Sequence, residues 1–298
     1  MHILTFDIEE WFHLLDNEST KGPEEWVKYP CRIYENMDRI FALLDRHNRR
    51  ATFFVLGWIA QKYPDVVKRI SDNGFDLGFH TTNHQLIHEQ TPEDFYADIV
   101  KGLDCLENIV GKKVESFRAP GFSLTESCNW AFDILAELGI KYDSSVFPMH
   151  HAHGGYPSFP HIGPALIKTH TGDIKEFPIS VGKLFGKSIV YSGGGYFRLF
   201  PYTLIKTLAR KETYLMSYLH PRDMDAGQPM IKDLPLSRKF KSYVGLKTCA
   251  AKFEHWINDF PCIDICTAAS IVDWAQVPVV DLKKTSQPLN PELLIAAL

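Results

Sequence analysis

The sequence lacks several features that would point to particular classes of protein. It contains no run of like charges, and its formal net charge is only −4 over 298 residues. Proteins that bind nucleic acid or anionic lipid usually present clustered basic residues, so we expect neither partner. No stretch reaches the ~18 uncharged apolar residues that a membrane-spanning helix needs, so no integral membrane segment is expected.

The first residues also lack the pattern of a secretory signal. The opening MHILTFDIEEWF has no basic segment and no long apolar stretch, and it carries acids where a signal peptide stays apolar. We therefore expect a cytoplasmic protein, unless a targeting segment preceded these residues.

The six cysteines form no CxxC pair. Residues 262–266, CIDIC, come closest, and we interpret them as a short apolar strand in which cysteine packs as a small hydrophobic residue. Reduced thiols in the core are expected, rather than a disulfide framework or a cysteine-bound zinc.

What the sequence does contain is a regular alternation of buried strands and amphipathic helices. Hydrophobic residues make up 45% of the chain, enough for one large core or two ordinary ones. Strands are predicted at 3–6, 51–56, 75–79, 114–117, 140–142, 176–179 and 214–219. Helices are predicted at about 34–47, 64–73, 92–110, 125–138, 202–210 and 246–260. This alternation is typical of parallel βαβ units, so the fold class is α/β, and with no linker in view we expect a single domain over 1–298.

Polar residues of catalytic type follow four of these strands directly. They are Asp7, His80, Arg118 and Asp143. Because ligands gather at the carboxyl ends of parallel strands, we expect all four to border one mouth. His220 ends a later strand, although a lone histidine there is more often a packed residue.

Two local patterns suggest a metal site. Asp7 and Glu9 lie two apart, so an extended chain points both carboxylates the same way, and one could bind a cation while the other accepts a proton. His80 and His84 form HTTNH, whose spacing places both rings on one side of a turn, as in many zinc sites. An isolated HxxxH is weak evidence among 13 histidines, but its position after a strand strengthens it.

Five segments, in this order, resemble the motifs of the NodB-type polysaccharide deacetylases, carbohydrate esterase family 4. They are TFDIEE, HTTNH, FRAPG, YDSSVFP and YLHP, which together span about residues 1–225. The later stretches around SGGGYFRLFPYTLI and LSRKFKSYVGL resemble the C-terminal extension, about 226–280, of the branch found with exopolysaccharide and O-antigen gene clusters.

The resemblance implies a distorted (β/α) barrel of about seven parallel strands that holds a divalent cation, with Zn²⁺ expected. It implies removal of N-acetyl groups from an amino sugar of a surface polysaccharide or its precursor, so the partner would be an N-acetylated saccharide. The implied roles are Asp7 as general base, Glu9, His80 and His84 as metal ligands, Arg118 holding Asp7, Asp143 supporting the site, and His220 as general acid.

The sequence departs from the family pattern at one ligand. The family has a second aspartate where this chain offers Glu9 or, as a weaker candidate, Glu10, and His13 is close enough in sequence to substitute. The late motif also reads Tyr-Leu-His instead of the commoner Leu-x-His, which leaves the placement of His220 open.

Two other functions stay open at this point. One is a metal-independent amidohydrolase of allantoinase type, against which the intact His80 and His84 count. The other is a carbohydrate-binding protein that keeps the fold without activity, against which Asp7, Arg118 and His220 count. No feature of the sequence points to a particular sugar, linkage or oligomeric state.

Overall fold

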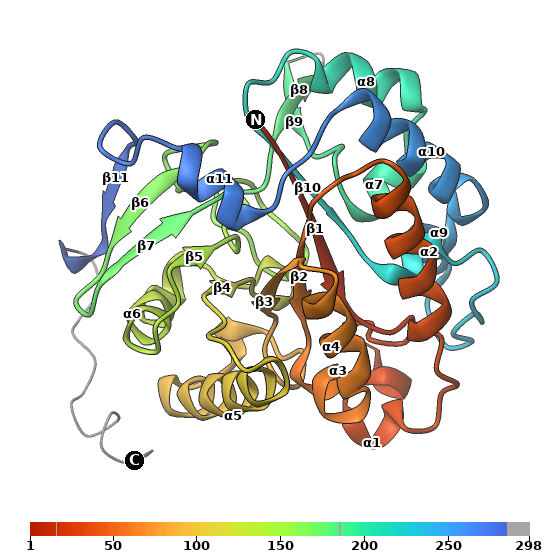
Figure 1. Cartoon of the computed structure of the whole chain (residues 1–298), viewed down its shortest axis with the longest axis horizontal. Coiled ribbons are helices and arrows are strands. Elements are labelled where there is room, and N and C mark those ends of the chain that lie inside the picture. The colour runs from red at the N-terminus through yellow and green to blue at the C-terminus, as the bar shows by residue number, and fades with distance from the viewer. Residues whose placement is uncertain (16, 185, 285–298) are drawn as a thin grey trace.

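One large sheet organises the chain in the computed structural model, which describes residues 1–15, 17–184 and 186–284 (Figure 1). Its nine described strands follow the order β10–β1–β2–β3–β4–β5–β7–β6–β11. They are β1 (His2–Ile8), β2 (Thr52–Val55), β3 (Asp76–Phe79), β4 (Ser116–Phe117), β5 (Tyr142–Asp143), β6 (Ala165–Lys168), β7 (Asp173–Glu176), β10 (Leu215–Leu219) and β11 (Val279–Asp281). A separate antiparallel hairpin pairs β8 (Gly182–Leu184) with β9 (Lys187–Ile189).

Most of the sheet is parallel. From β10 across to β7 every neighbouring pair runs in the same direction, whereas β6 is antiparallel to β7 and parallel to β11. The predicted α/β class with a largely parallel sheet is therefore confirmed. Among the described residues the pairing ends at β10 on one side and at β11 on the other, so closure into a barrel stays a prediction.

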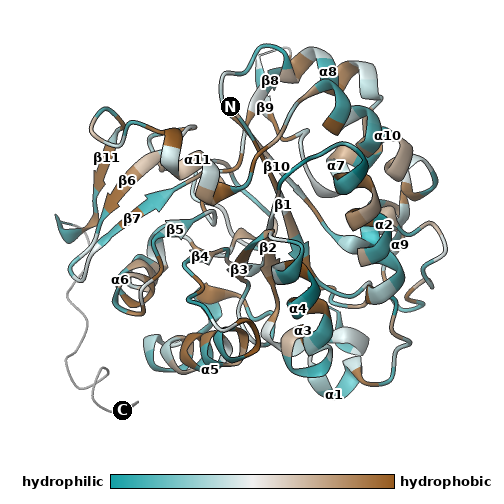
Figure 2. Cartoon of the chain, in the orientation of Figure 1, coloured by the Kyte–Doolittle hydropathy of each residue, from teal (hydrophilic) through white to brown (hydrophobic). Residues whose placement is uncertain are grey.

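Helices surround the sheet (Figure 1), and the longer ones, such as α2, α5 and α10, bury part of their surface. They are α1 (Pro23–Trp26), α2 (Ile33–Arg46), α3 (Gly57–Lys62), α4 (Pro64–Asp72), α5 (Pro92–Val110), α6 (Trp130–Glu137), α7 (Gly194–Leu199), α8 (Tyr202–Ala209), α9 (Leu236–Tyr243), α10 (Leu246–Asp259) and α11 (Ile265–Ile271). Figure 2 shows helices such as α5 carrying both hydrophobic and hydrophilic residues, as expected for elements with one face in solvent. None of the described helices is long and apolar enough to cross a membrane.

The ends of α5 show how closely local sequence sets an element. The Thr91 hydroxyl accepts a hydrogen bond from the Asp94 amide at 3.1 Å, and Pro92 occupies the first turn. At the other end Gly111 adopts a left-handed conformation with φ 67°, and its amide donates to the Glu107 carbonyl at 2.7 Å. Both predicted boundaries of this helix are confirmed.

Other sequence predictions need correction. The strand predicted at 262–266 is wrong, because the Asp264 side chain accepts from the Thr267 amide and starts α11 instead. Only Ile263 makes a bridge, to Ile3 of β1. The strand predicted at 176–179 lies earlier, as β7. All six cysteines are free, as expected for reduced thiols, although two of them are exposed.

The centre of the sheet positions the residues of interest. β1 is buried along its whole length and lies between β10 and β2. Phe6 of β1 pairs in register with Leu219 of β10, so Asp7 and His220 leave adjacent parallel strands side by side. The N-terminal and C-terminal parts of the chain therefore meet in one sheet at the point where the polar residues gather.

Candidate active site

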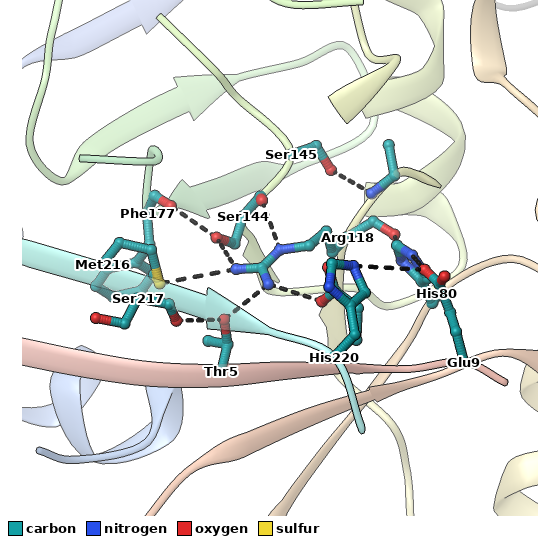
Figure 3. Close-up of polar contacts among 12 residues, drawn as sticks. Thr5, Glu9, His80, Arg118, Ser144, Ser145, Phe177, Met216, Ser217 and His220 are labelled. Carbon is teal, nitrogen blue, oxygen red and sulfur yellow. Dashed lines mark hydrogen bonds and ion pairs between the residues drawn. The ribbon is translucent and has the colours of Figure 1, made fainter. Parts of the chain in front are cut away.

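Three side chains form a buried cluster at the carboxyl end of the sheet. Glu9 follows β1, and His80 and His84 follow β3. Glu9 Oε1 lies 3.1 Å from His80 Nε2 and 2.8 Å from His84 Nε2 (Figure 3 shows the His80 contact). Each of the three residues is at most 6% exposed. Among the described residues this is the one group of histidines, cysteines and acids whose ligand atoms, here within 4.8 Å of one another, could hold a metal ion.

The orientation of His80 is set by a backbone carbonyl. Its Nδ1 lies 2.7 Å from the Arg118 carbonyl oxygen, which can only accept, so Nδ1 carries the proton. In a neutral ring this leaves a lone pair on Nε2, which faces the Glu9 carboxylate. His84 Nε2 is also buried, and although it lies 2.8 Å from Glu9 Oε1 it makes no contact with hydrogen-bond geometry within the described residues. Electron-rich atoms that converge in this way need a shared proton or a cation, so the donor set fits a divalent metal.

The loop that carries His84 is anchored by neighbouring helices. Thr81 and His84 have positive φ angles of 62° and 57°, which are unfavourable for residues other than glycine. The loop is held in place because the amide of Gly57 donates to the Thr81 carbonyl and the amide of Thr82 donates to the carboxylate of Asp98 in α5. With these backbone angles the His84 ring points toward Glu9.

Asp7 is held by a fully buried arginine. Arg118 Nη1 donates to Asp7 Oδ1 at 2.8 Å and to Thr5 Oγ1 at 2.7 Å, while Nε and Nη2 donate to the carbonyl and hydroxyl of Ser144 (Figure 3). The guanidinium also lies 4.4 Å from the ring centre of Phe54. One oxygen of Asp7 is thus fixed by a charge-assisted hydrogen bond, and the other faces His220.

His220 faces the same space from β10. Its Nε2 lies 3.8 Å from Asp7 Oδ2 and 4.0 Å from Glu9 Oε1, and its Nδ1 lies 3.2 Å from Asp223 Oδ2. Burial lowers the pKa of His220, but the hydrogen bond with Asp223 and the charge of Glu9 outweigh it and raise the pKa to about 9. The imidazole is therefore protonated at neutral pH. Asp223 is in turn 2.8 Å from Nε of Arg198, and despite its burial the Arg198 charge holds its pKa far below the usual range.

Asp143 does not contact the Glu9, His80 and His84 cluster and pairs with Ser145 instead. It ends β5 and accepts hydrogen bonds from the amide and hydroxyl of Ser145, and that hydroxyl also accepts from the amide of Ala119. Burial raises the pKa of Asp143, and both burial and Asp143 raise that of the neighbouring Glu176. Asp143 therefore braces the strand end that carries Arg118 instead of facing the cluster.

The two substitute ligands considered from the sequence have other surroundings. Glu10 accepts from the amides of Arg32 and Ile33, at the start of α2, at 2.8 and 3.0 Å. His13 Nδ1 accepts from the Glu10 amide, and its ring packs 4.2 Å from that of Trp26. Glu9 is consequently the carboxylate that stands with His80 and His84.

The cluster lies in a large cavity. Its volume is about 820 Å³, and Asp7, Glu9, both cluster histidines and His220 line it. Farther out the lining includes Tyr196, Leu199 and Phe240, which are 44–59% exposed. A cavity of this size, with polar groups and exposed aromatic rings in its lining, suits a sugar, whose ring faces stack on aromatic side chains.

Sequence reasoning missed several supporting residues. Thr5 and Ser144 hold Arg118, Asp223 holds His220, and Arg198 holds Asp223. Asp223 had a sequence signal, since it follows His220 by three residues and its side chain accepts from the His220 amide. The others depend on contacts between distant segments.

Comparisons with known proteins find similar sequences over parts of the chain. Residues 21–142 match the family model described as Polysaccharide deacetylase, and residues 144–269 match a domain of unknown function, DUF3473. A peptidoglycan-N-acetylglucosamine deacetylase of Bacillus cereus is 34% identical over 94 residues, 31% of this chain and 34% of the relative. A chitooligosaccharide deacetylase of Azorhizobium caulinodans is 34% identical over 101 residues, 33% of this chain and 46% of the relative.

The chain thus spans less than half the length of either relative. These matches show that part of the chain is similar to polysaccharide deacetylases. A crystal structure from Mycobacterium smegmatis, provisionally described as a polysaccharide deacetylase, superposes with a TM-score of 0.62 at 17% identity, covering 97% of this chain and 94% of the other. That similarity shows a shared fold.

Proposed function

We propose that this chain is a metal-dependent hydrolase that removes N-acetyl groups from an amino sugar of a surface polysaccharide or of its precursor. The observation that carries the proposal is the Glu9, His80 and His84 cluster, with Asp7 and His220 facing the same space at adjacent strand ends. Relatives named for sugar deacetylation support the reaction class.

In this proposal Glu9, His80 and His84 hold the cation, and Zn²⁺ suits a set of two imidazoles and one carboxylate. When bound, such a cation lowers the pKa of a water molecule and polarises the acetyl carbonyl. The carbonyl contact of His80 keeps its Nε2 available for the metal.

The remaining steps belong to side chains of this chain. Asp7 accepts a proton from the attacking water through the oxygen that Arg118 leaves uncovered. His220, protonated at neutral pH and steadied by Asp223, donates a proton to the amine as it leaves. Acetate and a free amino sugar result. Arg118 and Asp143 act as positioning residues, because neither faces the cavity floor.

We further propose that the two matched regions act as one unit, since Tyr142 at the end of the first region pairs with Lys175 of β7 in the second, and Arg32 of the first forms an ion pair with Asp225 of the second. Membership in the branch found with exopolysaccharide and O-antigen genes is part of this proposal, and action in the cytoplasm stays a prediction.

The test is acetate release from N-acetylglucosamine oligomers by the metal-loaded chain and by Asp7→Asn. We expect release by the parent and a fall of about 10²- to 10⁴-fold in the variant, the usual contribution of a general base. Equal release by both would remove Asp7 from the mechanism. Hydrolysis of allantoin instead of the oligomers would favour the amidohydrolase, and saccharide binding without any hydrolysis would favour the non-catalytic protein.

A further inference from the structure

Arg222 is a buried cation in the wall of the cavity without a matching anion. It follows His220 in the short helical turn Pro221–Met224 after β10, it is 7% exposed, and it lines the 820 Å³ cavity. Burying a guanidinium is unfavourable unless its charge and its N–H groups are satisfied. The proposed deacetylation does not use it.

Its own contacts satisfy little of that need. Nη2 donates to the Ser242 carbonyl at a long 3.4 Å, and the guanidinium lies 5.8 Å from the ring centre of Tyr243. Nε has no hydrogen-bond partner within the described residues. A guanidinium offers five N–H groups in a planar fork, so most of this capacity is unused. Burial and the nearby Arg198 lower the pKa of Arg222, as expected for a cation that lacks compensation.

The neighbouring acid is already engaged. Asp223 Oδ2 accepts from the amide of His220 and lies 3.2 Å from its Nδ1, while Oδ1 lies 2.8 Å from Nε of Arg198. Arg198 donates its other groups to the carbonyls of Lys241, Ser242 and Val244. Around this one carboxylate the protein therefore places two guanidiniums, those of Arg198 and Arg222, which leaves a surplus of positive charge.

The rest of the described lining does not cancel that surplus. Its acids are Asp7, Glu9 and Asp223, and the first two face Arg118 and the two cluster histidines. The lining of the same cavity also includes the exposed rings of Tyr196 and Phe240. The occupant that complements this wall has ring faces and an oxyanion.

We propose that Arg222 binds an oxyanion carried by the saccharide substrate, within the same cavity as the acetyl-cleaving centre. This inference rests on the proposed function in one respect, since it takes the ligand to be the substrate of the deacetylation. A fork of two N–H groups matches carboxylate and phosphate oxygens alike. The oxyanion is therefore either the carboxylate of a uronic acid unit in a polysaccharide or the phosphate on the sugar of a precursor.

Calorimetric titration of the metal-loaded chain with three probes tests the proposal. The probes are N-acetylglucosamine 1-phosphate, a tetrasaccharide of alternating glucuronic acid and N-acetylglucosamine, and neutral chitotetraose. The proteins are the parent, Arg222→Met, Arg222→Lys and, as a matched control, Arg210→Met, whose arginine is exposed at the end of α8. We expect the parent to bind one anionic probe more tightly than chitotetraose, and the preferred probe identifies the source of the oxyanion.

Arg222→Met should weaken binding of that probe roughly 10- to 100-fold, while its effect on chitotetraose is small. The control should bind all probes as the parent does. The proposal would be overturned if the parent and Arg222→Met bound the preferred anionic probe equally tightly. It would also be overturned if the parent bound neither anionic probe more tightly than chitotetraose. If Arg222→Met does not fold, Arg222→Lys becomes the test, because it keeps the charge and loses the fork. Weaker binding of the anionic probe then supports the proposal, and unchanged binding overturns it.

The outcome is separable from that of the proposed function. Arg222-dependent anion binding without acetate release from any probe would refute deacetylation and keep the oxyanion site. Acetate release without an anion preference would keep deacetylation and refute the oxyanion site.

Discussion

Replacing Arg118 with methionine should destabilise the chain by about 3–5 kcal/mol, the usual cost of removing one partner of a buried ion pair. Arg118 is fully buried, and its guanidinium donates to Asp7, Thr5 and Ser144. Methionine keeps most of the apolar stem, so the main loss is electrostatic. Asp7, only 3% exposed, would then lose the guanidinium that donates to its Oδ1.

The assay is urea unfolding followed by circular dichroism at pH 7, with a chelator present so that metal binding adds nothing to the free energy of unfolding. Asp7→Asn provides a double-mutant cycle, because it removes the charge to which Arg118 donates. The double variant should be more stable than Arg118→Met alone, with a coupling of about 1–3 kcal/mol. A loss below about 1 kcal/mol for Arg118→Met, or additive losses in the cycle, would refute the reasoning.

Two further predictions concern packing and pH. In Gly102→Ala the new methyl group would collide with the ring of Phe79, so we expect the free energy of unfolding to fall by about 1–3 kcal/mol and the melting temperature to drop. The control is Gly163→Ala, whose methyl group meets open space and which should melt as the parent does. Equal melting temperatures of the two variants would contradict this packing. Burial raises the pKa of Asp225, but the hydrogen bond and charge of Arg32 hold it below its usual value of about 4, so the stabilisation from this pair is present above that pH and lost as the pH falls. Arg32→Met should therefore lower the melting temperature more at pH 7 than at pH 3, and an equal loss at both would count against the pair.

The part of the site that sequence could predict is the part that the sheet itself positions. Asp7 lies near the end of β1, while His80 and Arg118 directly follow β3 and β4, and the parallel strands bring these ends together. Asp7 and His80 line the cavity, whereas Arg118 does not and instead holds Asp7. The spacing of Asp7 and Glu9 also predicted that both would point the same way. Glu10, next along the chain, points to the start of α2 instead.

The other supporting residues of the site could not be predicted, because they depend on contacts between segments far apart in the sequence. Arg198 reaches the backbone around Ser242, 44 residues away, and through Asp223 it steadies His220. Nothing in the sequence indicates that Arg222 is buried, and its burial is the observation that marks it as a candidate anion-binding residue. The wrong strand at 262–266 has a local cause, because the apolar run hid the capping role of Asp264.

The most direct test of the account is zinc titration of chelator-stripped protein with acetate release from an N-acetylglucosamine oligomer as the readout. The Glu9, His80 and His84 cluster predicts no release without metal and full activity at one equivalent of zinc per chain, with His84→Ala inactive at that same equivalent. Acetate release that is unchanged by stripping the metal, or unchanged in His84→Ala, would contradict the account.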